Sequence, residues 1–108
     1  MNTQFTPDWV KTAPTRGDAI AILTEWITTL VSRYPQVPTW TIVNEPWSHG
    51  NRDIWREKIG DDYPFIAARA ARDANPAAAL ILNDYDNHLP TPTADSNFDL
   101  ARRMAADG

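Results

Sequence analysis

The stretch "TWTIVNEPWSHG", residues 39–50, decides the fold class because it contains a short strand with a charged end. Pro38 precedes the strand, and every residue of Thr39–Val43 is β-branched or aromatic. Such a run is too short for a helix and has the composition of a strand. Two polar side chains, Asn44 and Glu45, follow it directly. The stretch therefore predicts a buried strand that presents a carboxylate at its carboxyl end.

Helical patterns lie on both sides of this strand. We expect the first helix to begin with Asp18 as its N-cap and to end at Pro35, since the apolar residues between them recur at three- and four-residue spacing: Ile20, Leu23, Ile27, Leu30, Val31 and Tyr34. We expect the second to begin at residue 61 or 62, with Pro64 in its first turn, and to stop at the Asn75–Pro76 step.

A second strand is predicted at 78–82, where "AALIL" is continuously apolar, as in a parallel strand that is covered on both faces. It ends in the polar cluster "NDYDN". The segment before Asp18 has two prolines and a glycine and is predicted to be a loop. A last helix, capped by Ser96, is expected to bury the weak apolar face formed by Phe98, Ala101, Met104 and Ala105.

The alternation of helices and strands defines the fold class as α/β, because strands joined by helical crossovers run parallel. From Thr39 to Ala79 the chain advances 40 residues, a little more than one strand-helix unit of an eight-fold barrel, which takes roughly 31. Two strands cannot close a barrel. We therefore expect residues 1–108 to be a slice of a larger domain with missing sequence on both sides, and the spacing fits part of a (β/α)8 TIM barrel.

Composition excludes several classes of partner. The net charge is -4 with a sequence pI near 4.9, and the Lys and Arg residues are scattered, so we expect no nucleic-acid partner. No apolar window approaches the length of a membrane span, which takes about eighteen residues. The chain has no cysteine, and His49 and His88 lack the close spacing of a metal pair. We expect no cofactor and no metal.

Ligands of parallel α/β folds lie beyond the carboxyl ends of the strands, where Glu45 is placed. Glycoside hydrolysis needs a carboxylic acid and a second carboxylate, about 5–5.5 Å apart if the configuration is retained. We expect Pro46 to hold Glu45 in extended backbone angles. Strand alternation then puts Asn44 on the opposite face, so both reach one ligand only if the strand bends. Spacing alone leaves open whether Glu45 is a catalyst or a solvated charge.

A resemblance narrows these interpretations. "TWTIVNEPW", followed by "IGDDYPFIAARAARDANPAAALILNDYDN", resembles the middle of the glycoside hydrolase family 10 endo-β-1,4-xylanases, and "QFTPDWV" resembles the segment after that family's third strand. The resemblance implies that the two strands are the fourth and fifth of the barrel and that Glu45 is the general acid/base. It implies substrate contacts for four residues: Asn44, Gln4, Trp47 and Tyr85.

The same resemblance sets limits and expectations for the whole protein. The family's nucleophile is a glutamate at the end of the seventh strand, and no such segment occurs in this sequence. We therefore expect the isolated chain to be inactive, its substrate to be xylan or xylo-oligosaccharides, and its parent to be secreted or periplasmic, although this chain shows no signal peptide. The oligomeric state is not indicated.

Three alternatives stay open from the sequence. "NEP" also occurs in the related family 5 cellulases and mannanases, so the chain could be a fragment of one of these. It could belong to a non-catalytic carbohydrate-binding protein, in which the aromatic residues matter and the carboxylates do not. It could also be a small self-contained α/β protein whose strand edges are covered by a second copy.

Overall fold

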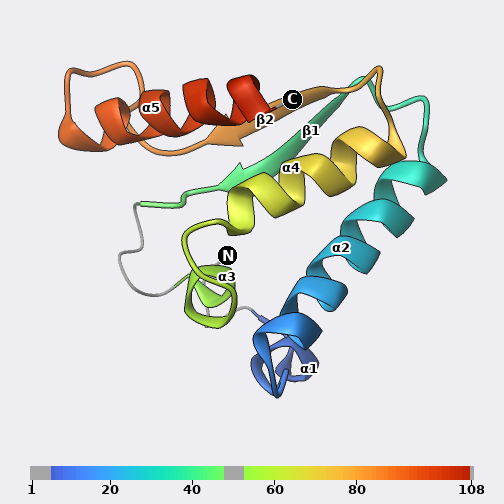
Figure 1. Cartoon of the computed structure of the whole chain (residues 1–108). Helices are drawn as coiled ribbons and strands as arrows, with labels where there is room; N and C mark the ends of the chain where they lie inside the picture. Colours follow the sequence, from blue (N-terminus) through green and yellow to red (C-terminus); the bar gives the residue numbers. More distant parts are fainter. Residues whose placement is uncertain (1–5, 48–52, 108) are drawn as a thin grey trace.

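The computed structural model describes residues 6–47 and 53–107. Within these residues, five helices and two strands follow one another in the order that the sequence predicts, with two short helices added (Figure 1). Their bounds are α1 Asp8–Lys11, α2 Arg16–Arg33, β1 Thr39–Asn44, α3 Ile54–Lys58, α4 Tyr63–Ala74, β2 Ala79–Asn83 and α5 Pro92–Asp107. Within the described residues no helix is long and apolar enough to cross a membrane.

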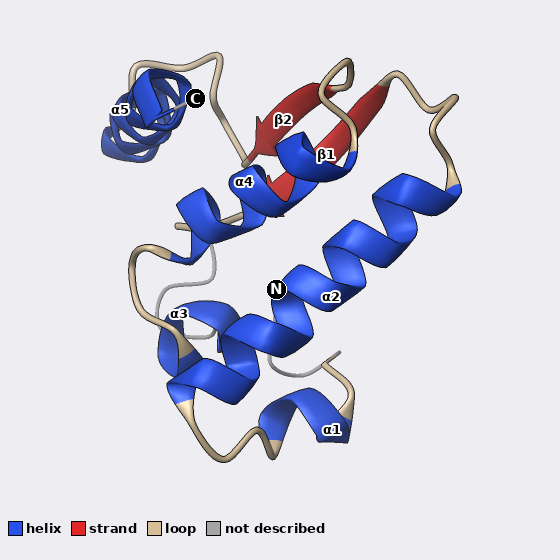
Figure 2. Cartoon of the chain, turned by 45° about the vertical axis from the view of Figure 1, so that its right-hand side comes forward, coloured by secondary structure: helices blue, strands red, loops and turns tan. Residues whose placement is uncertain are grey.

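The sheet consists of β1 and β2, which run parallel, with α4 as the crossover between them (Figure 2). The register pairs Thr39 with Ala79 and Thr41 with Ile81, then shifts so that Val43 pairs with Leu82. Residue Ile42 is therefore the extra residue of a β-bulge, which bends a strand and changes the direction of its side chains. Helix α2 packs beside α4 (Figure 1), and α5 contacts α4 as well.

The expected burial of the strands is wrong for this chain. Val43 is the one buried residue of β1, and β2 alternates between exposed and half-buried residues. Strands of a parallel sheet are buried when neighbouring strands and helices cover both faces. Within the described residues each strand has one neighbouring strand. The apolar side chains of β1 and β2 are therefore only partly covered.

Helix α2 begins three residues earlier than predicted, because its cap is Thr15 rather than Asp18. The Thr15 side chain accepts a hydrogen bond from Asp18 N, and the Asp18 carboxylate accepts one from Thr15 N at 3.1 Å. The two residues form a capping box, in which Asp18 occupies the third helical position. Thr and Asp are both common N-cap residues, and the two reciprocal hydrogen bonds make Thr15 the cap and Asp18 its partner inside the helix.

Two further predictions of the helices need correction. The opening segment is not all loop, because Asp8–Lys11 forms the short helix α1, which buries Val10. Helix α5 begins at Pro92, four residues before the expected cap at Ser96. Its buried residues are Asn97 and Leu100, whereas Phe98 of the predicted apolar face is 73% exposed.

A single core joins the helices to the strand that carries the predicted site. Ile54 and Trp55 of α3 are both buried, together with Val43 of β1, Leu23 of α2 and Tyr63 of α4. Gly60 separates α3 from α4 at a φ of 116°, a backbone conformation that glycine adopts without strain. Helix α3 is therefore anchored beside the carboxyl end of β1.

Candidate active site

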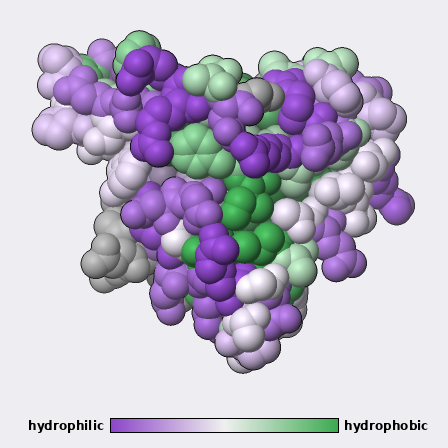
Figure 3. Space-filling view, in the orientation of Figure 1, coloured by the Kyte–Doolittle hydropathy of each residue, from purple (hydrophilic) through white to green (hydrophobic). Residues whose placement is uncertain are grey.

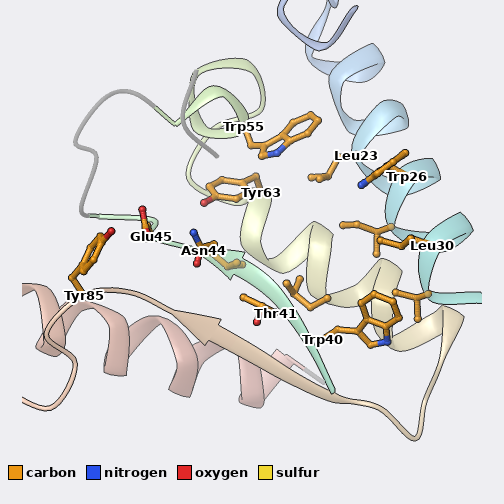
Figure 4. A pocket seen from close by; sticks show the side chains of 14 residues that line it. Leu23, Trp26, Leu30, Trp40, Thr41, Asn44, Glu45, Trp55, Tyr63 and Tyr85 are labelled. Atoms are coloured by element: carbon orange, nitrogen blue, oxygen red, sulfur yellow. The ribbon is translucent and has the colours of Figure 1, made fainter. Parts of the chain in front are cut away.

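Asn44 and Glu45 lie at the carboxyl end of β1, as predicted, and both line one cavity with Tyr85 from the segment after β2 (Figure 4). Asn44 and Glu45 can contact the same ligand only if the strand bends at its end, and two features of the structure produce such a bend. The bulge at Ile42 shifts the alternation of side chains. Glu45 itself has a φ of 52°. Neighbouring residues can therefore face one ligand although they are adjacent in the chain.

The expectation of extended angles at Glu45 is wrong, because its φ lies in the left-handed region. A non-glycine residue in this region costs on the order of 1–3 kcal/mol and persists only where neighbouring contacts hold it. One such contact is the bond from Glu45 N to the Asn83 carbonyl, 2.7 Å long. The restriction that Pro46 places on its neighbour is a preference, and the hydrogen bond across the sheet overrides it.

The ends of the two strands are tied together by side chains. Asn83 Nδ2 donates to Asn44 Oδ1 at 2.8 Å, which orients the Asn44 amide. Asp84, 8% exposed, accepts from Trp47 N at 3.1 Å with one carboxylate oxygen and from Tyr85 N at 2.8 Å with the other. Asp84 therefore fixes both strand-end loops. Its residue type alone predicts a turn former, and its place directly after a strand is the signal for the larger role.

Arg56 is a second residue of the site that the sequence pattern does not indicate. Its guanidinium lies 4.4 Å from the centroid of the Trp47 ring, and its Nη1 donates to the Pro46 carbonyl at 2.6 Å. Its Nε donates to Asp61 Oδ1 at 2.8 Å. Trp47, predicted to contact substrate, remains 38% exposed. One ring face is therefore occupied by a cation.

A buried pair supports the helix that carries Arg56. Asp53, the N-cap of α3, is 2% exposed and accepts from Trp55 N at 3.1 Å and from the Tyr63 hydroxyl at 2.5 Å. Burial raises the pKa of Tyr63 far above its ordinary value, and the hydrogen bond to the Asp53 carboxylate raises it further. Tyr63 therefore stays protonated and acts as a donor.

The cavity has a volume of about 600 Å³ and two different parts. Glu45, Asn44 and Tyr85 gather at one end, and the remainder is lined mainly by apolar side chains, among them Trp26 and Leu30 of α2, Trp40 of β1 and Trp55 of α3 (Figure 4). Figure 3 shows apolar side chains in the middle of one face of the molecule, surrounded by hydrophilic ones. A sugar has many hydroxyl groups, so the polar end is the candidate ligand site.

The other predicted site residues are placed as follows. Tyr85 is 60% exposed, as a ring that stacks on a ligand must be. Gln4 and His49 lie outside the described residues. Among residues 6–47 and 53–107, no group of three or more His, Cys, Asp or Glu side chains is placed to hold a metal ion, and His88 is exposed.

A carboxylic acid at the end of a strand, in an α/β unit with a parallel crossover, is the arrangement of the barrel-type glycoside hydrolases. Residues 2–108 match the family model described as glycosyl hydrolase family 10. The chain therefore belongs to this family, and the fold and family predicted from the sequence are confirmed.

Xylanases from bacteria and fungi are similar to this chain in sequence. The chain is 34% identical over 125 residues to endo-1,4-beta-xylanase C of Paenibacillus barcinonensis, covering 94% of this chain and 12% of that protein. It is 32% identical over 105 residues to endo-1,4-beta-xylanase C of Phanerodontia chrysosporium, covering 93% and 26%. The chain thus spans about a quarter or less of these proteins.

Solved structures agree with the sequence relatives. Native xylanase 10B from Thermotoga maritima superposes with a TM-score of 0.87 at 28% identity, covering 96% of this chain and 34% of that one. Xylanase 10B from Thermotoga petrophila, solved in complex with xylobiose, superposes with a TM-score of 0.85 at 27% identity, covering 94% and 33%. The structure therefore corresponds to about one third of the chain of each of these two xylanases.

Proposed function

We propose that this chain supplies the acid/base side of the active site in an enzyme that hydrolyses internal β-1,4-xylosidic bonds of xylan with retention of configuration. The observation that carries the proposal is the placement of Glu45 beside Asn44 and Tyr85 at the polar end of the cavity. Support for xylan comes from the xylanases among the relatives and from the neighbour solved with xylobiose.

In the first step, the protonated Glu45 gives its proton to the glycosidic oxygen as the bond from that oxygen to the anomeric carbon breaks. A second carboxylate, from the rest of the barrel, forms a bond to the anomeric carbon. In the second step, the ionised Glu45 takes a proton from water while the water oxygen attacks the anomeric carbon, and the bond to the second carboxylate breaks. Glu45 is thereby returned to its protonated form.

Asp84 is a carboxylate near Glu45, but its role is different. Both of its oxygens accept backbone N–H groups, from Trp47 and from Tyr85. A carboxylate that holds two loops in place is not positioned as a free nucleophile. The second catalytic carboxylate is therefore assigned to the part of the barrel outside this chain, and the 108 residues alone are proposed to be inactive.

The substrate contacts follow from the same geometry. The Asn44 amide, oriented by Asn83, is proposed to bind a sugar hydroxyl next to the reacting carbon. Tyr85 is proposed to pack against the sugar ring, because an exposed aromatic face covers the apolar face of a pyranose. Trp47 is proposed to contact the substrate with the side of its ring that remains exposed.

The test is Glu45→Gln in a complete barrel that contains residues 1–108, assayed on xylan and on xylo-oligosaccharides. The variant keeps the size of the side chain and removes its proton transfer, so we expect a loss of at least about 100-fold in kcat/KM on both substrates. Arg69→Gln, at an exposed ion pair on α4, is the matched control and should retain activity. Full activity of Glu45→Gln would overturn the acid/base role, whereas a complete barrel that binds xylo-oligosaccharides equally well with Glu45 or Gln and hydrolyses none would support a sugar-binding protein in which the carboxylates do not matter.

A further inference from the structure

We propose that Arg56 is a positioning residue for Glu45, and this inference rests on the proposed role of Glu45 as the acid/base. Arg56 lies on α3 and reaches the two residues that follow Glu45. It holds the Pro46 carbonyl by a 2.6 Å hydrogen bond and stacks 4.4 Å over the ring of Trp47. Nothing in the sequence motif of the strand end indicates this contact, because the motif ends before α3 begins at Ile54.

The need for such a hold comes from the backbone of Glu45. Its φ of 52° is unfavourable for a residue with a side chain, so the conformation must be maintained by contacts on both sides. On one side, Glu45 N is bound to the Asn83 carbonyl at 2.7 Å. On the other side, Pro46 has no N–H to donate. Contacts that fix the chain after Glu45 are therefore made through the Pro46 carbonyl and through the next residue, Trp47.

Arg56 suits this task because it is itself fixed. Its side chain is 19% exposed, and Asp61 holds its Nε at 2.8 Å. The preceding residues Ile54 and Trp55 are buried in the core, and the Asp53 cap starts the helix. A planar guanidinium can donate along its edge and stack on a ring with its face at the same time, which an ammonium group cannot do.

The chemical consequence concerns proton donation more than substrate affinity. A displacement of about 1 Å in a catalytic group can cost about 100-fold in rate. Loss of Arg56 releases the Pro46 carbonyl and the Trp47 ring, so the Glu45 backbone can relax toward an ordinary conformation and carry the carboxyl group away from the glycosidic oxygen. The value of kcat/KM then falls most for a substrate whose leaving group must be protonated as the bond breaks.

This dependence separates positioning from a general loss of structure. A xylo-oligosaccharide has a poor leaving group that must be protonated as the bond breaks, whereas a dinitrophenyl xylobioside has a good leaving group that departs without an acid. We compare kcat/KM for these two substrates, since kcat/KM reports the step up to bond cleavage. The experiment uses a complete barrel that contains residues 1–108.

For Arg56→Gln we expect kcat/KM on the xylo-oligosaccharide to fall about 10- to 100-fold, and on the dinitrophenyl substrate less than about threefold. Arg56→Lys, which keeps the charge but not the planar group, should recover only part of the loss. Arg69→Gln should leave both values unchanged, as a matched exposed arginine on α4. The melting temperature of each variant is recorded, so that the comparison is made on folded protein.

Three results would overturn the inference. Equal losses on the two substrates would make Arg56 a structural residue only, and full recovery in Arg56→Lys would show that its charge suffices. Unchanged kinetics in Arg56→Gln would remove any role. Glu45→Gln in the same assay tests the proposed function separately: if that variant shows the dependence on leaving group and Arg56→Gln does not, the acid/base role stands and the positioning role fails.

Discussion

Substitution of Tyr63 by phenylalanine removes one hydroxyl group from a buried pair. That hydroxyl donates to Asp53 Oδ2 at 2.5 Å, and the two residues are 3% and 2% exposed. A hydrogen bond to a buried charged group contributes about 1.5–3 kcal/mol. We therefore expect Tyr63→Phe to lower the free energy of unfolding by about 2 kcal/mol at neutral pH, because Asp53 loses a donor that water cannot replace.

The pH dependence gives a sharper test. The folded-state pKa of Tyr63 is raised by burial and by Asp53, so the unfolded chain ionises first as the pH rises. The stability that this tyrosine contributes is complete below about pH 10, its ordinary pKa, and is lost above that by about 1.4 kcal/mol per pH unit. The difference between the wild-type protein and Tyr63→Phe should therefore be about 1.4 kcal/mol smaller at pH 11 than at pH 9.

The assay is unfolding by urea at pH 7, 9 and 11, followed by circular dichroism, on a complete barrel that carries these residues. Tyr34→Phe, at a tyrosine that is 41% exposed, is the control and should change stability by less than about 0.5 kcal/mol. If the difference between the wild type and Tyr63→Phe stays constant from pH 9 to pH 11, Tyr63 is not held in its protonated form and the reasoning fails.

Four other measurements test the fold. Thr15→Ala removes the cap that accepts from Asp18 N and should cost about 1 kcal/mol in urea unfolding; no loss would argue against the capping box. Gly60→Ala, at a φ of 116° with the new Cβ 3.3 Å from Asp62 Oδ1, should lower the melting temperature. Gly17→Ala, inside α2 with no contact closer than 3.6 Å, should raise it or leave it unchanged. The isolated chain should bind a hydrophobic dye at its apolar cavity more strongly than a complete barrel does; equal fluorescence would show that the barrel leaves this surface open.

The local sequence predicts the positions of β1, β2, α2 and α4, because residue propensities and helix-ending residues determine them. The β-branched run predicts β1 to within one residue of Thr39–Asn44, and the apolar run before "NDYDN" predicts β2 to within one residue of Ala79–Asn83. Prolines and short polar residues mark the ends of α2 and α4. The prediction misses the start of α5 although the sequence contains its signal: Thr91 caps the helix by accepting from Ala94 N at 3.2 Å, and Pro92 follows at the first helical position.

The sequence does not predict the contacts that hold the strand end. Asp84 reaches Trp47 across 37 residues, and Arg56 reaches Pro46 across ten. Such contacts depend on how α3 and the two strands pack, and this packing cannot be predicted from composition. The conformation of Glu45 escapes prediction for the same reason, since its neighbour Pro46 argues locally for extended angles and the tertiary contacts decide otherwise.

The placement of Glu45 thus depends on three contacts from two other segments, α3 and the end of β2, rather than on its motif alone. The carbonyl of Asn83 holds the residue itself, Arg56 of α3 holds the next carbonyl, and Asp84 holds the N–H after that. Removal of any one leaves a backbone group unpaired and lets an unfavourable φ relax. An acid that must donate a proton and later recover it needs the same position in both steps. Contacts from separate elements provide that constancy because no single loop movement breaks all of them.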